Sequence, residues 1–330
     1  MRLAFIGSTG HQKLYKFVTD ERDQVSAVAI APGGNGSDAR VAACDIFDNV
    51  EQFDDPLEMM DKFKPDFVNV GAVYALNGDF VAAAMQRDIP VCSDKPIAAS
   101  WPQYDRLAAL AGADPGRIVV TEFQLRSRPA FRAARAAIAE GLIGQVVLAT
   151  GQKSYRIGTN RPAWYSNRDQ YGGTILWIAS HAVDFIRFAT GLEYSSVYGE
   201  QANISKPQYG SMEEVTVSIF GLENGGKAIV HADYNRPAKA PTHGDDRLRV
   251  VGSAGLVEVR DGRCMLMTND QDPVDITGRV DPAEAHHEIL AALRGKASDI
   301  YGTQTSLRSA KVLLHARDAA DEGRVVTITG

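Results

Sequence analysis

The sequence predicts an α/β protein with two domains: a doubly wound parallel sheet over residues 1–122, and an α+β domain with an open, mostly antiparallel sheet over residues 123–330. Three observations support this prediction. Short apolar runs alternate with amphipathic stretches in the first 120 residues, a glycine turn follows the first run, and later runs alternate in polarity without helices between them. The length of 330 residues also fits about two domains.

Strands of the first domain are predicted from short apolar runs that end at turn signals. The first run ends at Gly7, and a loop that begins with Pro32 closes the second. Compact apolar runs are typical of strands buried on both faces of a parallel sheet. The predicted strands are residues 3–6, 25–30, 67–70, 89–93 and 118–122.

Helices are expected between these strands. Leu14, Phe17 and Val18 recur at the spacing of one helical face. Further helices are predicted at residues 57–63, 79–87 and 103–111. Strand–helix alternation with short connections indicates a mostly parallel sheet.

The pattern changes beyond about residue 123. Helices are predicted at residues 129–140, 175–190, 283–293 and 306–320, and the last helix is expected to pack against the first domain. Runs of strands without intervening helices indicate an antiparallel sheet. Those strands are predicted at residues 146–150, 215–220, 227–233, 247–251, 255–260 and 324–328.

Composition excludes several classes of protein. The 35 basic and 41 acidic residues give a net charge of −6, which argues against a nucleic-acid partner. No apolar run approaches the ~18 residues of a membrane helix, and the first residues do not resemble a secretory signal. Cys44, Cys92 and Cys264 are isolated, so neither a disulfide framework nor a thiolate metal site is expected. We therefore predict a cytoplasmic protein without a metal.

The first turn, Gly7-Ser8-Thr9-Gly10-His11-Gln12, has features of a dinucleotide-binding turn. Glycines at this place let the backbone turn tightly and approach a pyrophosphate. The full G-x-G-x-x-G pattern is absent, because Thr9 and Gln12 stand at the second and third glycine positions. Its place directly after the first strand favours a Rossmann dinucleotide-binding domain over a plain strand–turn–helix.

The end of the second strand leaves the cofactor open between NAD and NADP. An acidic residue there usually binds the ribose 2′-hydroxyl of NAD. Here the strand ends Ala29-Ile30-Ala31-Pro32, without an acid, and Asp38 and Arg40 come later in the chain. The missing acid permits NADP without requiring it.

Two further segments resemble the glucose–fructose oxidoreductase / inositol dehydrogenase / MocA family of NAD(P)-dependent oxidoreductases. Residues 92–96 (CSDKP) match the place of the family's E-K-P tripeptide, and residues 171–184 (YGGTILWIASHAVD) resemble its G-G-x7-H-x-x-D helix. Similar segments at residues 128–144, 161–165 and 249–255 extend the resemblance over nearly the whole chain.

The resemblance makes Lys95 and His181 the candidate catalytic residues. Lys95 precedes a proline at the end of a strand, where ligands bind in open α/β sheets. His181 suits acid–base work on an alcohol–ketone pair and shares a helical face with Asp184. Asp184 is expected to orient His181, to bind sugar hydroxyls, or to have only a structural, capping role. The family often has an aspartate where this chain has Trp177, and indole cannot exchange a proton at neutral pH.

The resemblance also implies two sets of ligand contacts. The expected cofactor-binding residues are Gly7, Ser8, Thr9, Gly10, His11, Tyr74, Asn77, Asp94, Lys95 and Gln124. The expected substrate-binding residues are Tyr155, Arg156, Asn160, Trp164, Trp177, His181 and Asp184.

The predicted function is hydride transfer between a nicotinamide, NAD or NADP, and a hydroxyl or carbonyl carbon of a sugar, polyol or sugar derivative. A competing hypothesis is a non-catalytic NAD(P)- or sugar-sensing protein of the same fold, suggested by Trp177 and by the incomplete glycine pattern. The resemblance further implies a homodimer or homotetramer.

Overall fold

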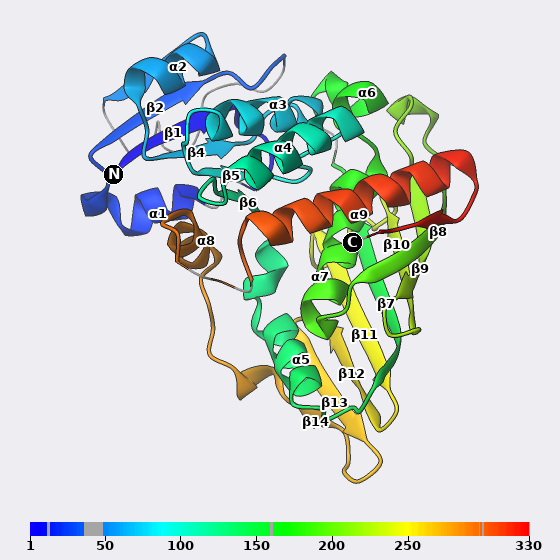
Figure 1. Cartoon of the computed structure of the whole chain (residues 1–330). Coiled ribbons are helices and arrows are strands. Elements are labelled where there is room, and N and C mark those ends of the chain that lie inside the picture. Colours follow the sequence, from blue (N-terminus) through cyan, green and yellow to red (C-terminus); the bar gives the residue numbers. More distant parts are fainter. Residues whose placement is uncertain (12–13, 36–48, 159–160, 297, 299, 330) are drawn as a thin grey trace. The chain divides into compact units, whose positions relative to one another are not determined.

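The chain forms two structural units in a computed structural model (Figure 1). The structure describes residues 1–11, 14–35, 49–158, 161–296, 298 and 300–329. Unit 1 comprises Met1–Phe123, Pro162–Gly172 and Glu284–Lys311. Unit 2 comprises Gln124–Arg161, Gly173–Ala283 and Val312–Gly330. Unit 1 therefore includes two segments that follow residue 122 in the sequence.

Unit 1 contains a six-stranded sheet in the order β3-β2-β1-β4-β5-β6. All neighbouring strands are parallel, and Ile6 of β1 pairs with Ala31 of β2 and Val70 of β4. This is the strand order of a Rossmann fold, and it confirms the predicted doubly wound sheet. The strands are β1 (Arg2–Ile6), β2 (Ala27–Ala31), β3 (Val50–Gln52), β4 (Phe67–Val70), β5 (Val91–Ser93) and β6 (Val119–Thr121).

Apolar cores fill both faces of this sheet. Side chains alternate along β1, so that Ala4 and Ile6 belong to one core while Leu3 and Phe5 belong to the other. The first core includes α2 (Pro56–Phe63), α3 (Tyr74–Met85) and α4 (Trp101–Ala113), and the second includes α1 (Leu14–Asp20) and α8 (Ala285–Leu293). The short helix α6 (Arg168–Tyr171) also belongs to unit 1.

The start of α9 (Thr303–Glu322) is bound to the edge strand β6. The hydroxyl of Thr303 accepts from the backbone of Val119 at 3.1 Å, and that of Ser306 accepts from Thr121 at 2.9 Å. These bonds satisfy edge-strand amides that would otherwise need water. The N-terminal part of α9 is thereby a component of unit 1, while its later residues belong to unit 2.

Unit 2 contains a nine-stranded sheet in the order β14-β13-β12-β11-β7-β10-β9-β8-β15. Strands β7 and β10 are parallel and every other neighbouring pair is antiparallel, which confirms the predicted mostly antiparallel sheet. The strands are β7 (Val146–Tyr155), β8 (Tyr194–Ala202), β9 (Val215–Leu222), β10 (Lys227–Asp233), β11 (Gly244–Gly252), β12 (Gly255–Arg260), β13 (Arg263–Thr268), β14 (Val274–Asp275) and β15 (Val326–Thr327).

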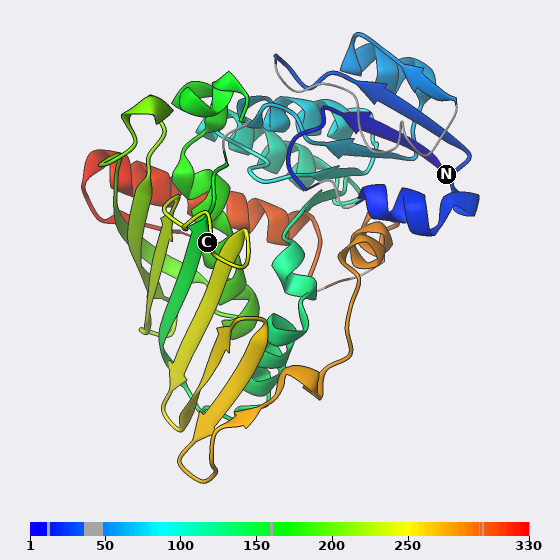
Figure 2. The same ribbon diagram turned by 180° about the vertical axis from the view of Figure 1, so that it is seen from behind.

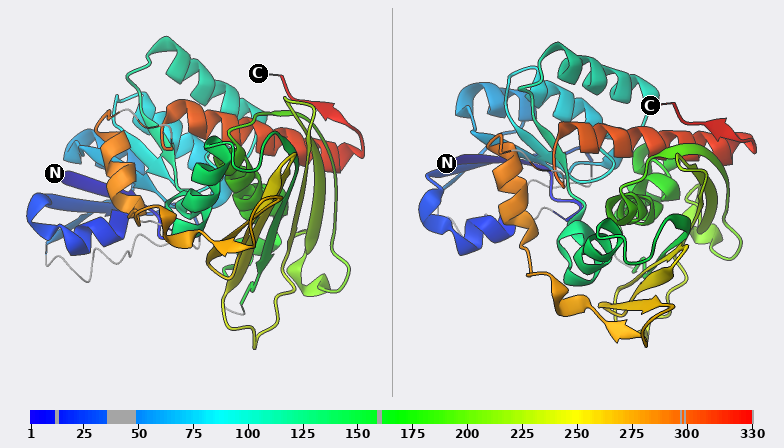
Figure 3. Two further views of the ribbon diagram at one scale, coloured as in Figure 1. Left: turned by 90° about the horizontal axis from the view of Figure 1, so that it is seen from below. Right: turned by 60° about the horizontal axis from the view of Figure 1, so that its bottom comes forward.

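Helices α5 (Pro129–Ala139) and α7 (Ser180–Thr190) cover one face of the nine-stranded sheet. Figure 3 shows the green helix α7 against that face. In Figure 2 the opposite face is turned to the viewer, and no helix among the described residues lies over it. Residues Ile175–Ala179 form a π-helical turn immediately before α7, so the helix predicted at 175–190 is present but changes its hydrogen bonding midway.

Candidate functional site

The carboxyl ends of β1, β2, β4 and β5 are joined by backbone hydrogen bonds between their turns. The amide of Gly7 donates to Ala31 at 2.9 Å, and that of Asp94 donates to Val70 at 2.9 Å. A Cβ on Gly33 would lie 2.6 Å from the Cα of Ala72, so the turns after β2 and β4 approach too closely for any other residue. Ligands bind at this edge of open α/β sheets.

The first turn has the backbone form that its glycines predict. Gly7 and Gly10 have φ values of +72° and +78°, a region that favours glycine. The hydroxyl of Thr9 lies 2.7 Å from the carbonyl of Gly71 and 2.6 Å from that of Ala72. Thr9, which stands at the second glycine position of the pattern, therefore ties the first turn to the turn after β4. Ser8 is exposed.

His11 and Asp94 link the first turn to the turn after β5. The His11 Nδ1 and the Asp94 Oδ1 are 3.1 Å apart, and Asp94 is fully buried. A Cβ on Gly10 would lie 1.8 Å from the other carboxylate oxygen, so this contact depends on glycine at position 10. Burial raises the pKa of Asp94, but the electrostatic interactions with Lys95 and His11 and the hydrogen bonds from both residues outweigh it and hold the pKa below its ordinary value.

Lys95 is buried next to Asp94, among aromatic rings of the same unit. Its Nζ lies 5.8 Å from the ring centroid of Tyr74, at the start of α3, and the peptide bond between Lys95 and Pro96 is cis. The hydroxyl of Tyr74 bonds that of Tyr165 at 3.0 Å, and Tyr165 stacks on Trp164 with centroids 3.9 Å apart. The candidate ammonium thus lies near the Tyr74 ring and interacts electrostatically with Asp94.

Asn77 holds the turn that contains Lys95. Its Oδ1 accepts from the amide of Ala72 at 3.1 Å, and its Nδ2 donates to the carbonyls of Asp94 at 3.3 Å and Pro96 at 3.1 Å. The side chain is fully buried. These bonds give Asn77 a positioning role, while the cofactor contact expected from the resemblance stays a prediction.

The residues of this edge fit the phosphates of a dinucleotide. The first turn presents an exposed Ser8 hydroxyl, and the His11 side chain is 24% exposed and able to take a positive charge. Strand β2 ends at Ala31 without an acid, as the sequence shows. Asp38 and Arg40 lie outside the described residues.

Unit 2 places His181 on α7, where it is 4% exposed. One turn along the same helix, Asp184 forms a buried ion pair with Arg126 of the 3₁₀ turn Gln124–Ser127. The Nε of Arg126 donates to Asp184 Oδ2 at 2.9 Å, and its Nη2 donates to the other oxygen. This ion pair gives Asp184 a structural contact, while its expected roles in orienting His181 and in binding sugar hydroxyls stay predictions. Arg126 was not a candidate from the sequence, although it lies two residues after Gln124.

Trp177 packs inside an aromatic cluster at the ends of β7 and β10. Its ring is stacked on Tyr234 at 5.6 Å and meets the edge of Tyr155 at 5.4 Å. The guanidinium of Arg161 lies 5.2 Å from the Trp177 centroid and 5.9 Å from that of Tyr155. Trp177 is 3% exposed, so its bulk fills space within unit 2.

The remaining candidates are spread over the two units. Arg156 donates to the carbonyl of Ala240 at 2.6 Å, and Gln124 is partly buried at the start of its 3₁₀ turn. Trp164 lies in unit 1 with Lys95. Asn160 lies outside the described residues. Tyr165, which bonds Tyr74, and His243, whose ring centroid lies 4.3 Å from that of Tyr155, were not among the predicted site residues.

Two family models match the chain. Residues 1–122 match an oxidoreductase family with an NAD-binding Rossmann fold, and residues 131–258 match the GFO/IDH/MocA C-terminal domain. The chain belongs to the Gfo/Idh/MocA family of oxidoreductases. An NAD-binding Rossmann domain and a second α+β domain are the parts that the sequence predicted.

Similar proteins agree with this assignment. A structure from Thermotoga maritima, assigned as an oxidoreductase, is 31% identical with a TM-score of 0.91, covering 99% of this chain and all of that one. Levoglucosan dehydrogenase in complex with NADH shares the fold at 16% identity and a TM-score of 0.80, covering 100% of this chain and 99% of that one. The scyllo-inositol 2-dehydrogenase (NAD(+)) of Bacillus subtilis is 25% identical over 62% of this chain and 58% of its own length.

These comparisons give no support to the non-catalytic sensing hypothesis, since the relatives named are dehydrogenases and oxidoreductases. Among the described residues, no helix is long and apolar enough to span a bilayer. No group of three or more metal-ligating side chains is found in the part of the chain that the structure describes.

Proposed function

We propose that this Gfo/Idh/MocA oxidoreductase is an NAD(P)-dependent dehydrogenase or reductase that acts on a CH–OH or carbonyl carbon of a sugar, polyol or sugar derivative. The observation that supports this proposal most is the buried Lys95, which follows β5 and lies beside Asp94 and the dinucleotide-binding turn. The names of its relatives, a scyllo-inositol dehydrogenase and a levoglucosan dehydrogenase, support the substrate class.

Lys95 and His181 are assigned the proton transfer. The nicotinamide, when bound, supplies the hydride chemistry at the substrate carbon. The Lys95 ammonium binds the substrate oxygen and stabilises the negative charge that develops there. The His181 imidazole takes up the hydroxyl proton in oxidation and returns it in reduction. Trp177 takes no part in proton transfer, because indole does not ionise near neutral pH.

Aromatic side chains are assigned to substrate binding. Sugar rings present C–H faces that pack on aromatic rings, and Trp164 and Tyr155 belong to the aromatic clusters of their units. Arg156 and Asn160 stay candidates for hydroxyl binding. Asp184 supports the helix that bears His181, through its ion pair with Arg126.

The test separates cofactor binding from turnover in a Lys95→Met variant. Binding is measured by NADH and NADPH fluorescence, and turnover by absorbance at about 340 nm over a panel of polyols, sugars and sugar acids. Turnover should fall by about 10²- to 10⁴-fold while cofactor affinity stays near that of the parent. Lys16→Met is the control, since Lys16 is half exposed and pairs with Glu284.

Near-normal turnover of Lys95→Met would remove Lys95 from the mechanism. Cofactor binding by the parent protein without reduction of any substrate would instead favour the sensing hypothesis. A His181→Asn variant and the double variant test whether both residues serve one reaction. Losses that multiply without interaction would contradict a shared step.

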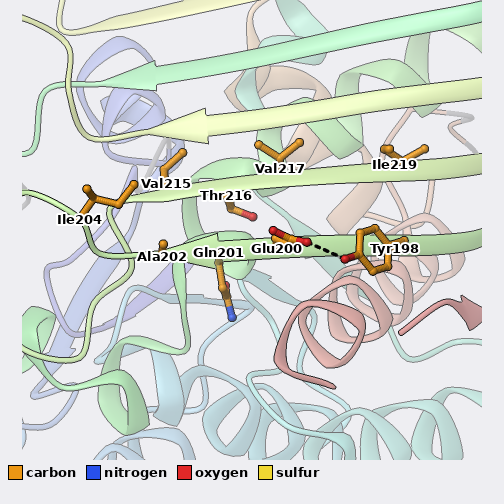
Figure 4. A pocket seen from close by; sticks show the side chains of 9 residues that line it. All are labelled: Tyr198, Glu200, Gln201, Ala202, Ile204, Val215, Thr216, Val217 and Ile219. Carbon is orange, nitrogen blue, oxygen red and sulfur yellow. Dashed lines mark hydrogen bonds between the residues drawn. The ribbon is translucent and has the colours of Figure 1, made fainter. Parts of the chain in front are cut away.

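We further propose that a second copy of the chain covers the outer face of the nine-stranded sheet, giving a homodimer or homotetramer. Strands β8 and β9 form a shallow hollow of about 420 Å³ there (Figure 4). Val217 and Ile219 are 44% and 49% exposed, and Ile204 is 80% exposed. Contiguous apolar patches of this kind mark interaction surfaces. Light scattering should show the oligomer in the parent, and a Val217→Glu, Ile219→Glu variant should be monomeric.

A cytoplasmic location is proposed on the free, buried thiols of Cys92 and Cys264, which suit a reducing compartment. Cell fractionation with an antibody to the native protein tests it. Recovery from an oxidising compartment would contradict the proposal.

A further inference from the structure

His11 is built into the cofactor-binding turn as one half of an imidazole–carboxylate pair. Its Nδ1 faces Asp94 Oδ1 at 3.1 Å, and the side chain keeps 24% of its surface exposed while the carboxylate has none. The glycine at position 10 leaves the space that this carboxylate needs. The imidazole is therefore held in one orientation on the turn that binds the dinucleotide phosphates in this fold.

The charged and titratable groups around Asp94 determine the electrostatic environment of His11. Asp94 itself stays ionised, since its pKa lies below the ordinary value, and Lys95 is the cation on its other side. Glu122, whose amide donates to Ser93 at 2.9 Å, is the second acid at these strand ends. Burial, together with Glu122 and Asp94, raises the pKa of the Cys92 thiol well above its ordinary value, so Cys92 remains neutral.

An ionised Asp94 assigns the two ring nitrogens of His11 different tasks. A carboxylate accepts only, so Nδ1 bears a hydrogen in both protonation states of the ring. Nε2 is then the atom that gains or loses the proton. A neutral ring offers a lone pair at Nε2, which repels a phosphate oxygen, whereas the protonated ring offers an N–H and a positive charge.

We propose that His11 takes up one proton when the dinucleotide binds, so that affinity for the cofactor falls as the pH rises. The inference rests on the proposed function. The diphosphate is anionic at every pH near neutrality, and an anion near an imidazole favours its charged form. The proton comes from solvent to Nε2 and returns on dissociation, and no bond to the cofactor is made.

Linkage fixes the sign of the effect. The pKa of His11 is higher in the complex than in the free protein, because the bound anion stabilises the imidazolium. The dissociation constant is therefore lowest at acidic pH and rises between the two pKa values by up to about tenfold per pH unit. It levels off where the ring is neutral in both states.

The experiment is isothermal titration calorimetry of the full chain with NADH, from about pH 6 to 9, the range in which histidine titrates. At each pH the binding enthalpy is measured in buffers of low and high ionisation enthalpy. The slope of the observed binding enthalpy against the buffer's ionisation enthalpy gives the number of protons taken up. NADH is the probe because its diphosphate does not titrate in this range.

Three variants complete the design. His11→Gln keeps a hydrogen-bonding side chain beside Asp94 but cannot ionise, so it should bind NADH at least about tenfold more weakly at acidic pH and take up no proton. His11→Lys, which is charged throughout, should bind tightly without proton uptake. His287→Gln is the matched control, because His287 also pairs with a carboxylate in unit 1, Glu21 at 2.5 Å, and should leave the uptake unchanged.

The outcomes are distinct. Proton uptake by the parent and by His287→Gln, lost in both His11 variants, supports the inference. NADH binding without uptake, or uptake that persists in His11→Gln, overturns it and leaves the proposed function standing. If neither NADH nor NADPH binds the parent, the proposed function fails and takes this inference with it.

Discussion

The buried ion pair between Arg126 and Asp184 gives a prediction whose magnitude follows from its burial. The two side chains are 3% and 2% exposed, so solvent does not screen the charge that remains when one partner is removed. Asp184→Asn leaves a buried guanidinium with weakened compensation and should lower the free energy of unfolding by about 3–5 kcal/mol. Arg126→Met should lower the free energy of unfolding by a similar amount, because it leaves the Asp184 carboxylate buried without its partner charge.

The double variant Arg126→Met, Asp184→Leu should be more stable than either single variant. Apolar side chains of similar volume avoid the desolvation cost that a buried pair must repay, and such replacements are often neutral or stabilising. Urea unfolding monitored by circular dichroism measures all four corners of this double-mutant cycle. The expected interaction between the two sites is about 3 kcal/mol or more.

A control on the same helix calibrates the result. Arg187 pairs with Glu193, whose side chain is 36% exposed, and Glu193→Gln should cost only about 0–1 kcal/mol. Single variants at Arg126 and Asp184 that are no worse than this control would refute the argument from burial. Since Asp184 follows His181 by one helical turn, both single variants should also lose turnover.

Three further predictions test individual contacts. Gly10→Ala, with a φ of +78° and a Cβ 1.8 Å from Asp94 Oδ2, should weaken NADH binding at least about tenfold by fluorescence titration, whereas Gly141→Ala, with a φ of +76° and no near neighbour, should not. The pKa of Glu214, which burial raises but several hydrogen bonds lower to about 2, predicts that Glu214→Gln costs at most about 3 kcal/mol at neutral pH. In urea unfolding that loss should fade as the pH drops below 4.5 toward 2, where the native carboxylate is protonated as well. Trp177→Asp should lower the melting temperature without raising turnover, because it buries a charge where an aromatic ring packed; a gain in turnover at an unchanged melting temperature would contradict this.

Strands with a strong apolar pattern could be predicted from the sequence almost to the residue. β4 and β10 were predicted with their observed bounds, because the pattern of apolar residues in each segment corresponds to the side chains that are buried in the sheet. β8 was not predicted, because its residues (YSSVYGEQA) include serine, glycine, glutamate and glutamine and give no clear alternation. It becomes a strand by pairing with β9, along a register that shifts between Tyr194 and Ser196. Such pairing is a tertiary effect and leaves no local signal.

The start of helix α3 was also mispredicted, because tertiary contacts determine where it begins. The sequence predicted a helix from residue 79, but the structure begins it at Tyr74. The first turn of α3 is held by tertiary contacts, among them the bond between Tyr74 and Tyr165 at 3.0 Å. A helix start set by a partner 91 residues away cannot be read from local spacing.

In the candidate site, too, local features could be predicted from the sequence and tertiary contacts could not. Local motifs pointed to the first turn, to Lys95 and to His181, each of which belongs to a recognisable short segment. Which residues pair with one another was not predictable, because the members of each pair are remote in sequence: His11 and Asp94 are 83 residues apart, and Arg126 and Asp184 are 58 apart. Only the fold brings such pairs together, and their energetics depend on burial that the fold creates.

Two of the departures from the family pattern, Thr9 and Trp177, are explained by the contacts that these residues make. Thr9, at a glycine position, places its hydroxyl between the carbonyls of Gly71 and Ala72, and so adds a tie between turns that glycine cannot make. Trp177, at the aspartate position, is packed between Tyr155 and Tyr234. Under the proposed function, the roles assigned to Lys95 and His181 need no carboxylate at position 177, where the Trp177 ring packs within unit 2.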